Sequence, residues 1–234
     1  IMLINRHIDQ YKSGLFALSE MKLFYLAVFF MTFAESMIAI FVPVYLYKLG
    51  FEIPIIIIYF LVLSFWFVLF SVTGAKVCSK IGIKHSIILS TLFLIAYYLL
   101  LNFIGSLNLI FFIAPLMLAV SHILYNYGFH LNFVVNSKKF KRGRQVSYME
   151  IVYTLASAAG PLLAGIVITY FGFSALFGLG SLILVGGALL LLTSHEKYEP
   201  IKIDFKKCFN YLATNGNWKN LLSFSGYAIE STID

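Results

Sequence analysis

The chain has 234 residues, of which 61% are hydrophobic and 12% are charged, with a net charge of +7 and a mean hydropathy of +0.91. Soluble domains average about a quarter charged residues. The composition therefore excludes a soluble domain and predicts an all-α integral membrane protein built as a polytopic helical bundle. The two cysteines, Cys78 and Cys208, lack metal-ligand spacing and imply no disulfide framework.

The first predicted element is a short cytoplasmic segment over residues 1–21, which mixes charged and apolar residues. It lacks the continuous apolar core of a cleavable signal peptide, so we expect it to lie at the membrane surface. The chain starts at Ile1 and stops at Asp234 inside a new apolar segment. We therefore expect it to be a fragment of a longer protein.

Apolar runs between residues 22 and 193 predict six transmembrane helices, each of which needs about 20 residues. The first lies between Lys22 and Lys48 and contains Glu35 as its only charged residue. Gly, Asn and Ser clusters predict the turns between later helices. The remaining predicted parts are one span at 53–75, two spans within 85–137 around a turn at 101–108, two within 151–195 around a turn at 170–174, a cytoplasmic linker at 194–220, and the start of a seventh span at 221–234.

The distribution of Lys and Arg predicts the orientation of these spans. With a cytoplasmic N-terminus, every Lys and Arg except Lys48 falls in a segment on the cytoplasmic side. Cytoplasmic loops carry an excess of these residues, so we expect a multi-pass protein of the cytoplasmic membrane with its N-terminus inside. The positive net charge is then an orientation signal and gives no reason to expect a nucleic-acid partner.

Residues 75–85, AKVCSKIGIKH, resemble the loop signature G-x-L-A-D-R-x-G-R-R of the major facilitator superfamily. Gly82 and the basic Lys80 and Lys84 match this signature, while Ser79 stands in the place of its acid. In the family this loop braces the cytoplasmic side against the partner half, so the resemblance implies that these four residues contribute to gating. A plain loop of positive charge is the alternative.

The sequence ASAAGPLLAG, which starts at Ala156, is similar to the antiporter-type signature g-x-x-x-G-P-x-x-G-G, with matches at Gly160, Pro161 and Gly165. Ala156, Gly160 and Ala164 lie four residues apart on one helix face, where small side chains let a neighbouring helix approach closely. Ordinary helix packing explains the same pattern equally well.

An internal echo adds to the resemblance, because FAESMI at residues 33–38 is repeated as AIESTI at residues 228–233. The resemblance implies twelve spans in two parallel halves of six. This chain would then hold the N-terminal half at 22–193 and the start of the seventh span, with the C-terminal half as its partner. Antiporters of the family commonly carry an arginine in the fourth span, and no arginine occurs there in this chain.

The ionisable residues inside the spans are the candidates for substrate and proton binding, because charge in the membrane core is costly and usually functional. All of them fall on helices that the resemblance places around a central cavity. We expect Glu35, at mid-span, to carry a coupling proton or to bind a cationic group of the substrate. The alternative is a protonated Glu35 that is hydrogen-bonded to Thr32 or to a neighbouring helix. Glu230 repeats Glu35 in the seventh span.

The predicted fourth span carries a polar stripe at four-residue spacing, formed by His122, Asn126 and His130. His122 lies at a depth similar to that of Glu35, so we assign His122 and Asn126 to substrate or proton binding. His130 and Glu150 flank the basic loop at 138–144, which suggests that they help to close a cytoplasmic gate. The alternative for Glu150 is that it complements the N-terminus of its own helix and the basic loop.

These features predict a secondary active transporter that moves a small solute by alternating access, without a metal or organic cofactor and without enzyme activity. The antiporter-type signature suggests proton-coupled export. One alternative is the membrane domain of an ATP-binding cassette exporter, although the chain contains no G-x-x-x-x-G-K-[ST] motif. Another is an intramembrane enzyme, which would need the clustered acids that this chain lacks.

Overall fold

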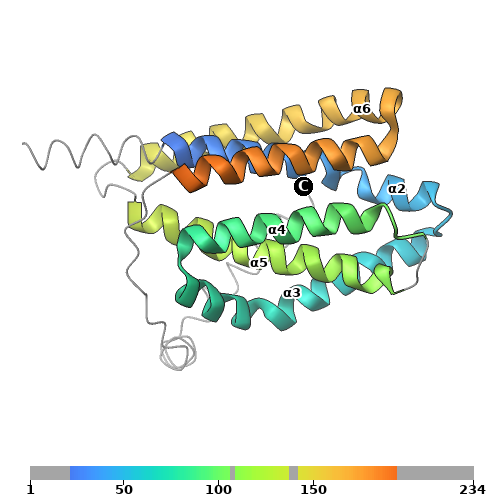
Figure 1. Ribbon diagram of the computed structural model, residues 1–234, viewed down its shortest axis with the longest axis horizontal. Helices are drawn as coiled ribbons and strands as arrows, with labels where there is room; N and C mark the ends of the chain where they lie inside the picture. Colours follow the sequence, from blue (N-terminus) through green and yellow to red (C-terminus); the bar gives the residue numbers. More distant parts are fainter. Residues whose placement is uncertain (1–21, 106–108, 137–141, 194–234) are drawn as a thin grey trace, which may run out of the picture. The chain divides into compact units, whose positions relative to one another are not determined.

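The computed structural model describes residues 22–105, 109–136 and 142–193, and within these ranges the chain is helical and has no strand. The first helix covers residues 22–39, and a short turn separates it from α2 (Val42–Lys48). The other helices are α3 (Ile53–Ile81), α4 (Ile83–Leu101), α5 (Ile110–Asn136) and α6 (Arg142–Thr193) (Figure 1). Five stretches are long and apolar enough to cross a membrane, the first being Lys22–Lys48. The all-helical membrane class predicted from composition is thereby confirmed.

Prolines mark the start of two helices. Pro43 lies in the first turn of α2 and Pro54 in the first turn of α3. A first-turn N–H has no intrahelical partner, so proline loses nothing at these positions. Pro43 also accounts for the turn before α2, since its ring clashes with a preceding helical turn.

The connection between α3 and α4 differs from the prediction. We expected a loop over residues 75–85, but α3 continues to Ile81 and α4 begins at Ile83. Only Gly82 breaks the helical path, with φ of 96° and ψ of 159°. A positive φ is easily adopted only by glycine, so Gly82 supplies the whole turn. The polar residues that suggested a loop instead lie on helix ends, where Lys side chains reach water along their own apolar stems.

Two other turns lie where the sequence predicted them. The chain leaves α4 at Asn102, at the start of the turn expected at 101–108. Within α6, Gly172 has φ of 80° and ψ of −179°, which is non-helical. Figure 1 shows α6 reversing direction along its length, in yellow and then orange. The break at Gly172 falls inside the turn expected at 170–174, whereas the total of six spans and a partial seventh stays a prediction.

The first helix packs tightly against α6. A Cβ atom added at Gly160 would collide with Ser36 Oγ and would lie 2.9 Å from both Met37 N and Phe33 O. Ser36 Oγ donates a hydrogen bond of 3.2 Å to the carbonyl oxygen of Ala156. The absence of a side chain at Gly160 therefore lets the two helix backbones approach closely, as small residues do in membrane helix pairs.

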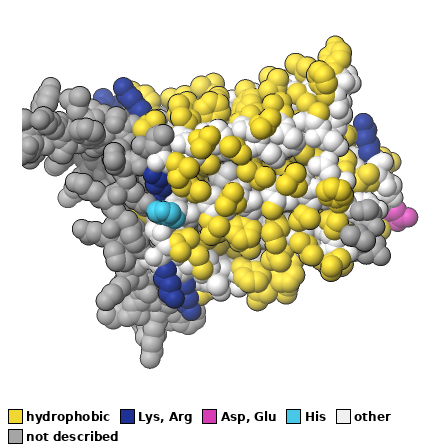
Figure 2. Space-filling view, viewed as in Figure 1, with side chains coloured by type: hydrophobic (Ala, Val, Ile, Leu, Met, Phe, Trp, Pro, Cys, Tyr) yellow, Lys and Arg dark blue, Asp and Glu magenta, His cyan; other side chains and the backbone are white. Residues whose placement is uncertain are grey.

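Apolar side chains cover the outside of the helices. Figure 2 shows hydrophobic side chains in a broad band, with Lys and Arg side chains near the two ends of the described helices. The most exposed helix is α3, in which only 11% of the most apolar window is buried. Exposed apolar residues of this kind, such as Val68 at 74% and Leu61 at 62%, are expected for a surface in contact with lipid or with other membrane helices.

Candidate functional site

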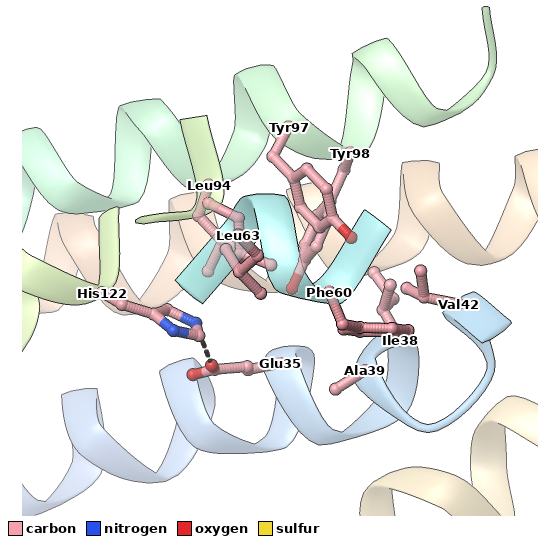
Figure 3. A pocket seen from close by; sticks show the side chains of 11 residues that line it. Glu35, Ile38, Ala39, Val42, Phe60, Leu63, Leu94, Tyr97, Tyr98 and His122 are labelled. Atoms are coloured by element: carbon pink, nitrogen blue, oxygen red, sulfur yellow. Dashed lines mark ion pairs between the residues drawn. The ribbon is translucent and has the colours of Figure 1, made fainter. Parts of the chain in front are cut away.

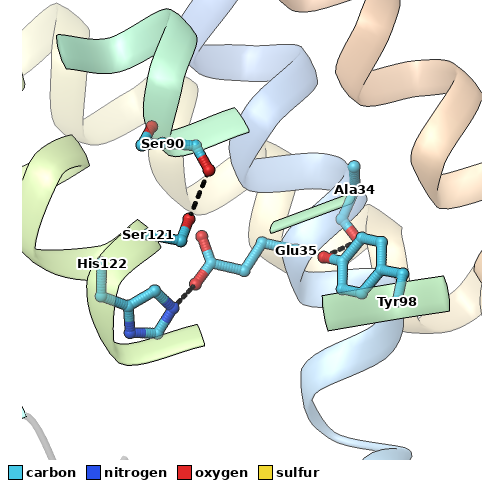
Figure 4. A network of polar contacts seen from close by, with 6 residues as sticks. All are labelled: Ala34, Glu35, Ser90, Tyr98, Ser121 and His122. Carbon is cyan, nitrogen blue, oxygen red and sulfur yellow. Dashed lines mark hydrogen bonds and ion pairs between the residues drawn. The ribbon is translucent and has the colours of Figure 1, made fainter. Parts of the chain in front are cut away.

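An ion pair joins Glu35 on the first helix to His122 on α5. The distance between Glu35 Oε1 and His122 Nε2 is 2.7 Å (Figures 3 and 4). About a third of each side chain remains exposed, 35% for Glu35 and 34% for His122. Glu35 lies near the middle of the candidate span Lys22–Lys48, and His122 lies inside the candidate span Ile110–Phe133. The sequence had placed both residues at similar depth, and the structure brings them into direct contact.

The pairing has a clear electrostatic reason. A lone charge at the centre of a bilayer is expensive, and a partner of opposite charge lowers that cost. The residues beside Glu35 in the chain hold its helix firmly in place, since Ala34 is fully buried and Thr32 is 5% exposed. The carboxylate therefore projects from a rigid helix toward α5.

A chamber of about 150 Å³ opens beside this pair. Figure 3 shows side chains from the first helix, α3, α4 and α5 converging on it, with Glu35 and His122 at one side. Its walls are otherwise apolar or aromatic. The described residues that line it are Glu35, Ile38, Ala39, Val42, Phe60, Leu63, Leu94, Tyr97, Tyr98, Leu118 and His122.

The two tyrosines of the chamber have their hydroxyl groups engaged. Tyr98 OH donates to the carbonyl oxygen of Ala34 at 3.5 Å, and Tyr59 OH donates to Tyr97 OH at 3.4 Å. Both chamber tyrosines are almost fully buried, at 1% and 2% exposure. They therefore contribute ring surface to the chamber and fix α4 against the first helix and α3.

A second, much smaller space of about 10 Å³ lies near the same pair and has a more polar lining. Ser121 Oγ donates a hydrogen bond of 2.8 Å to the carbonyl oxygen of Ser90 (Figure 4). Ser90, Thr91 and Ser121 all line this space. Such a volume is close to that of a single water site. Glu35 thus lies between an apolar chamber and a small group of hydroxyl side chains.

Sequence reasoning missed most of the chamber wall. Phe60, Leu63, Tyr97 and Tyr98 come from helices that are apolar on every side. Such helices have no polar face to distinguish inward from outward residues, so periodicity carries no signal. The pair was found because an ionisable residue inside an apolar run stands out.

The other members of the α5 stripe lie apart from the pair. Asn126 and His130 are both exposed, and the His130 ring lies 5.3 Å from that of its neighbour Phe129. Only His122 contacts Glu35. Glu230, the predicted counterpart in the seventh span, lies outside the described residues.

The position of Glu150 can be compared with its two expected roles, as a gate residue beside His130 and as a residue that complements its own helix N-terminus and the basic loop. Glu150 is exposed, and no ion pair joins it to His130 in the part of the chain that the structure describes. Because α6 begins at Arg142, Glu150 lies more than two turns inside the helix. The helix dipole acts mainly within the first turn, so the position of Glu150 does not support the helix N-terminus as its partner, while its roles beside the basic loop and in a gate stay predictions.

The residues of the first signature contact helix backbones. Lys84 Nζ donates to the carbonyl oxygen of Leu192 at 2.8 Å, and Ser79 Oγ donates to that of Lys76 at 2.8 Å. Leu192 lies on α6, close to the end of the part of this helix that the structure describes. Lys84 therefore joins α4 to α6, while Gly82 forms the joint described above and Lys80 lies in the last turn of α3.

The residues of the second signature lie on two sides of α6. Ala156 and Ala164 are fully buried and Gly160 contacts the first helix, whereas a Cβ at Gly165 would meet nothing within 4 Å. Pro161 lies inside α6 and is half-buried. The close approach between α6 and the first helix therefore occurs at Gly160. Gly165 makes no close approach to the described residues.

Within the described ranges, no group of three or more His, Cys, Asp or Glu residues is arranged to hold a metal ion. The polar chemistry of this region rests on the carboxylate, the imidazole and the nearby hydroxyl groups.

Comparison with known proteins identifies the family. A family profile described as Major Facilitator Superfamily matches residues 24–231, which is most of the chain. A search of curated proteins finds no match. The family consists of membrane transporters that carry small molecules across the lipid bilayer, in agreement with the apolar helices described above. The chain is a multi-pass integral membrane protein that belongs to the Major Facilitator Superfamily.

Proposed function

We propose that the protein is a secondary active transporter that moves a small solute across the cytoplasmic membrane by alternating access, with Glu35 and His122 at its binding site. The observation that carries this proposal is the Glu35–His122 contact of 2.7 Å beside a chamber of about 150 Å³. An ionisable pair next to a cavity inside membrane helices is typical of substrate and proton pathways.

Proton-coupled export is the finer part of the proposal. A carboxylate that exchanges partners between a histidine and an incoming solute can link binding to protonation. Either a bound proton or a bound solute would neutralise the carboxylate of Glu35, so that proton and solute compete for one site. The antiporter-type signature around Gly160 supports export. The N-terminus would lie in the cytoplasm, and the C-terminal half of the longer protein would complete the cavity.

Alternating access can be tested without knowledge of the substrate. In the complete protein, Cys78 and Cys208 are replaced by serine and a single cysteine is placed at Ala39, which lines the chamber. Oriented vesicles are treated with a membrane-impermeant maleimide from either side. We expect labelling from both sides, in a ratio that an imposed pH gradient shifts.

Two variants test whether the change of access is coupled to protonation of Glu35. Glu35→Gln should remove the response of the labelling ratio to the pH gradient, because the side chain can no longer take up a proton. The matched control is Glu52→Gln, which changes an exposed acid before α3. Labelling from one side only under all conditions would contradict alternating access, and an unchanged pH response in Glu35→Gln would contradict the coupling role.

A further inference from the structure

We propose that the chamber binds a small lipophilic organic cation, an ammonium ion with an aromatic or alkyl group, whose charged head replaces His122 as the partner of Glu35. This inference rests on the proposed transport function and assigns a substrate class to the same site. Three properties of the chamber carry it: its charge, its walls and its volume.

The charge of the chamber favours a cation. Among the described residues that line it, Glu35 is the only acid, and neither Lys nor Arg is present. Among these lining residues only the imidazole of His122 can carry positive charge, and Glu35 already holds it, so an anionic solute would meet the carboxylate without a free positive group to bind it. A cation meets a carboxylate in surroundings of low polarity, where the attraction between opposite charges is strong.

The walls favour an apolar body. Phe60, Tyr97 and Tyr98 provide aromatic surface, and Leu63, Leu94 and Leu118 provide aliphatic surface. The hydroxyl of Tyr98 is engaged with the backbone and that of Tyr97 with Tyr59. A solute with many hydroxyl groups, such as a sugar, would leave its polar groups without partners at these walls, which is costly. Aromatic faces instead attract organic ammonium ions.

The volume sets the size of the group that binds in the part of the cavity formed by the described helices. A cavity of about 150 Å³ with apolar walls is known to accept a molecule the size of benzene. The chamber has this volume. A single six-membered ring or a short branched alkyl group therefore fits, with its ammonium head at the Glu35 side.

His122 acts as the built-in competitor. Glu35 Oε1 already holds His122 Nε2 at 2.7 Å, so an incoming ammonium group has to take the place of the imidazole. A merely structural histidine would support the site, and its loss would weaken binding. A competitor predicts the opposite result, and this difference makes the inference testable.

The experiment measures equilibrium binding to the purified complete protein in detergent. The probe is benzyltrimethylammonium, which carries a permanent charge on a single ring. Benzyl alcohol and phenylacetate serve as neutral and anionic compounds built on the same ring. We expect the cation to bind at least about tenfold more tightly than either, because a lost charge pair in a buried site typically costs a factor of this size or more.

Variants then separate the roles of the two residues. Glu35→Gln should weaken binding of the cation by about tenfold or more, and His122→Gln should tighten it by about threefold or more. Glu52→Gln should leave it unchanged. A second pair of variants tests the chamber without a change of charge. Ala39→Phe should fill the chamber and abolish binding of the cation. Ile40→Phe changes the neighbouring exposed residue, which does not line the chamber, and should leave binding intact.

Two outcomes would overturn the inference. One is binding of benzyl alcohol or phenylacetate as tight as that of the cation, and the other is weaker cation binding in His122→Gln. Either result, together with two-sided labelling of the Ala39→Cys protein, would remove the substrate class and leave the transport function standing. One-sided labelling would instead remove the transport function itself.

Discussion

Lys84, in the first turn of α4, donates a hydrogen bond of 2.8 Å from its ammonium group to the carbonyl oxygen of Leu192 on α6. Two helices that are far apart in the sequence are thereby joined. The donor is charged, and a hydrogen bond from a charged group is stronger than one between neutral groups.

Removal of this contact should destabilise the protein slightly. Lys84→Met is expected to lower the free energy of unfolding by about 0.5–1 kcal/mol, since the site is only partly buried. Lys84→Arg should retain most of the stability. Denaturant titration in detergent micelles measures the effect, with Lys22→Met at an exposed position as the control. Equal losses in the Lys84→Met and Lys22→Met proteins would show that the contact with Leu192 contributes nothing.

The two glycines of the second signature should respond differently to the same change. Gly160→Ala places a methyl group against Ser36 and the backbone of the first helix, and is expected to cost about 1–3 kcal/mol through overpacking. Gly165→Ala enters open space and should be neutral or stabilising by up to about 1 kcal/mol, because alanine favours the helix. Thermal unfolding of both variants makes the comparison, and similar shifts would argue against the close approach at Gly160.

The pair of Glu35 and His122 should be energetically coupled. Each single change to glutamine leaves the other side chain without its ionic partner, whereas the double variant removes both groups. In a double-mutant cycle of unfolding free energies, we expect a coupling of about 1 kcal/mol, in the range typical of residues in contact. Strict additivity of the two single effects would mean that the pair does not contribute to stability.

The turn at Gly172 should not tolerate a side chain well. With φ of 80°, Gly172→Ala is expected to destabilise the fold by about 1 kcal/mol, although a Cβ there would meet no neighbour within 4 Å. Gly178→Ala is the control, because that glycine is helical and equally unobstructed. The difference between their unfolding temperatures isolates the cost of the backbone conformation, and equal temperatures would contradict it.

Much of the fold follows from local chemistry that is visible in the sequence. The turn after Leu101 was predictable because Asn, Gly and Ser cluster there between apolar runs. The turn at Gly172 was predictable because a single glycine stands between two apolar runs. Basic residues at 75–85 were a misleading signal, since lysines are as compatible with a helix end as with a loop. Only the backbone shows that Gly82 alone makes the turn.

The candidate site was predictable only in its charged part. Glu35 and His122 stand out because each is polar in an apolar span. The selection of His122 over Asn126 or His130 as the partner depends on how α5 is rotated against the first helix, which four-residue spacing does not specify. The chamber wall depends in the same way on helix rotation, because Tyr97 and an outward-facing aromatic residue look alike in sequence.

Gly82 is the whole connection between α3 and α4. A joint of one residue can pivot, but it cannot stretch, so neither helix is able to slide along its axis without pulling its neighbour. Because Lys84 at the start of α4 also holds Leu192 of α6, a tilt of α3 would be transmitted through α4 to α6.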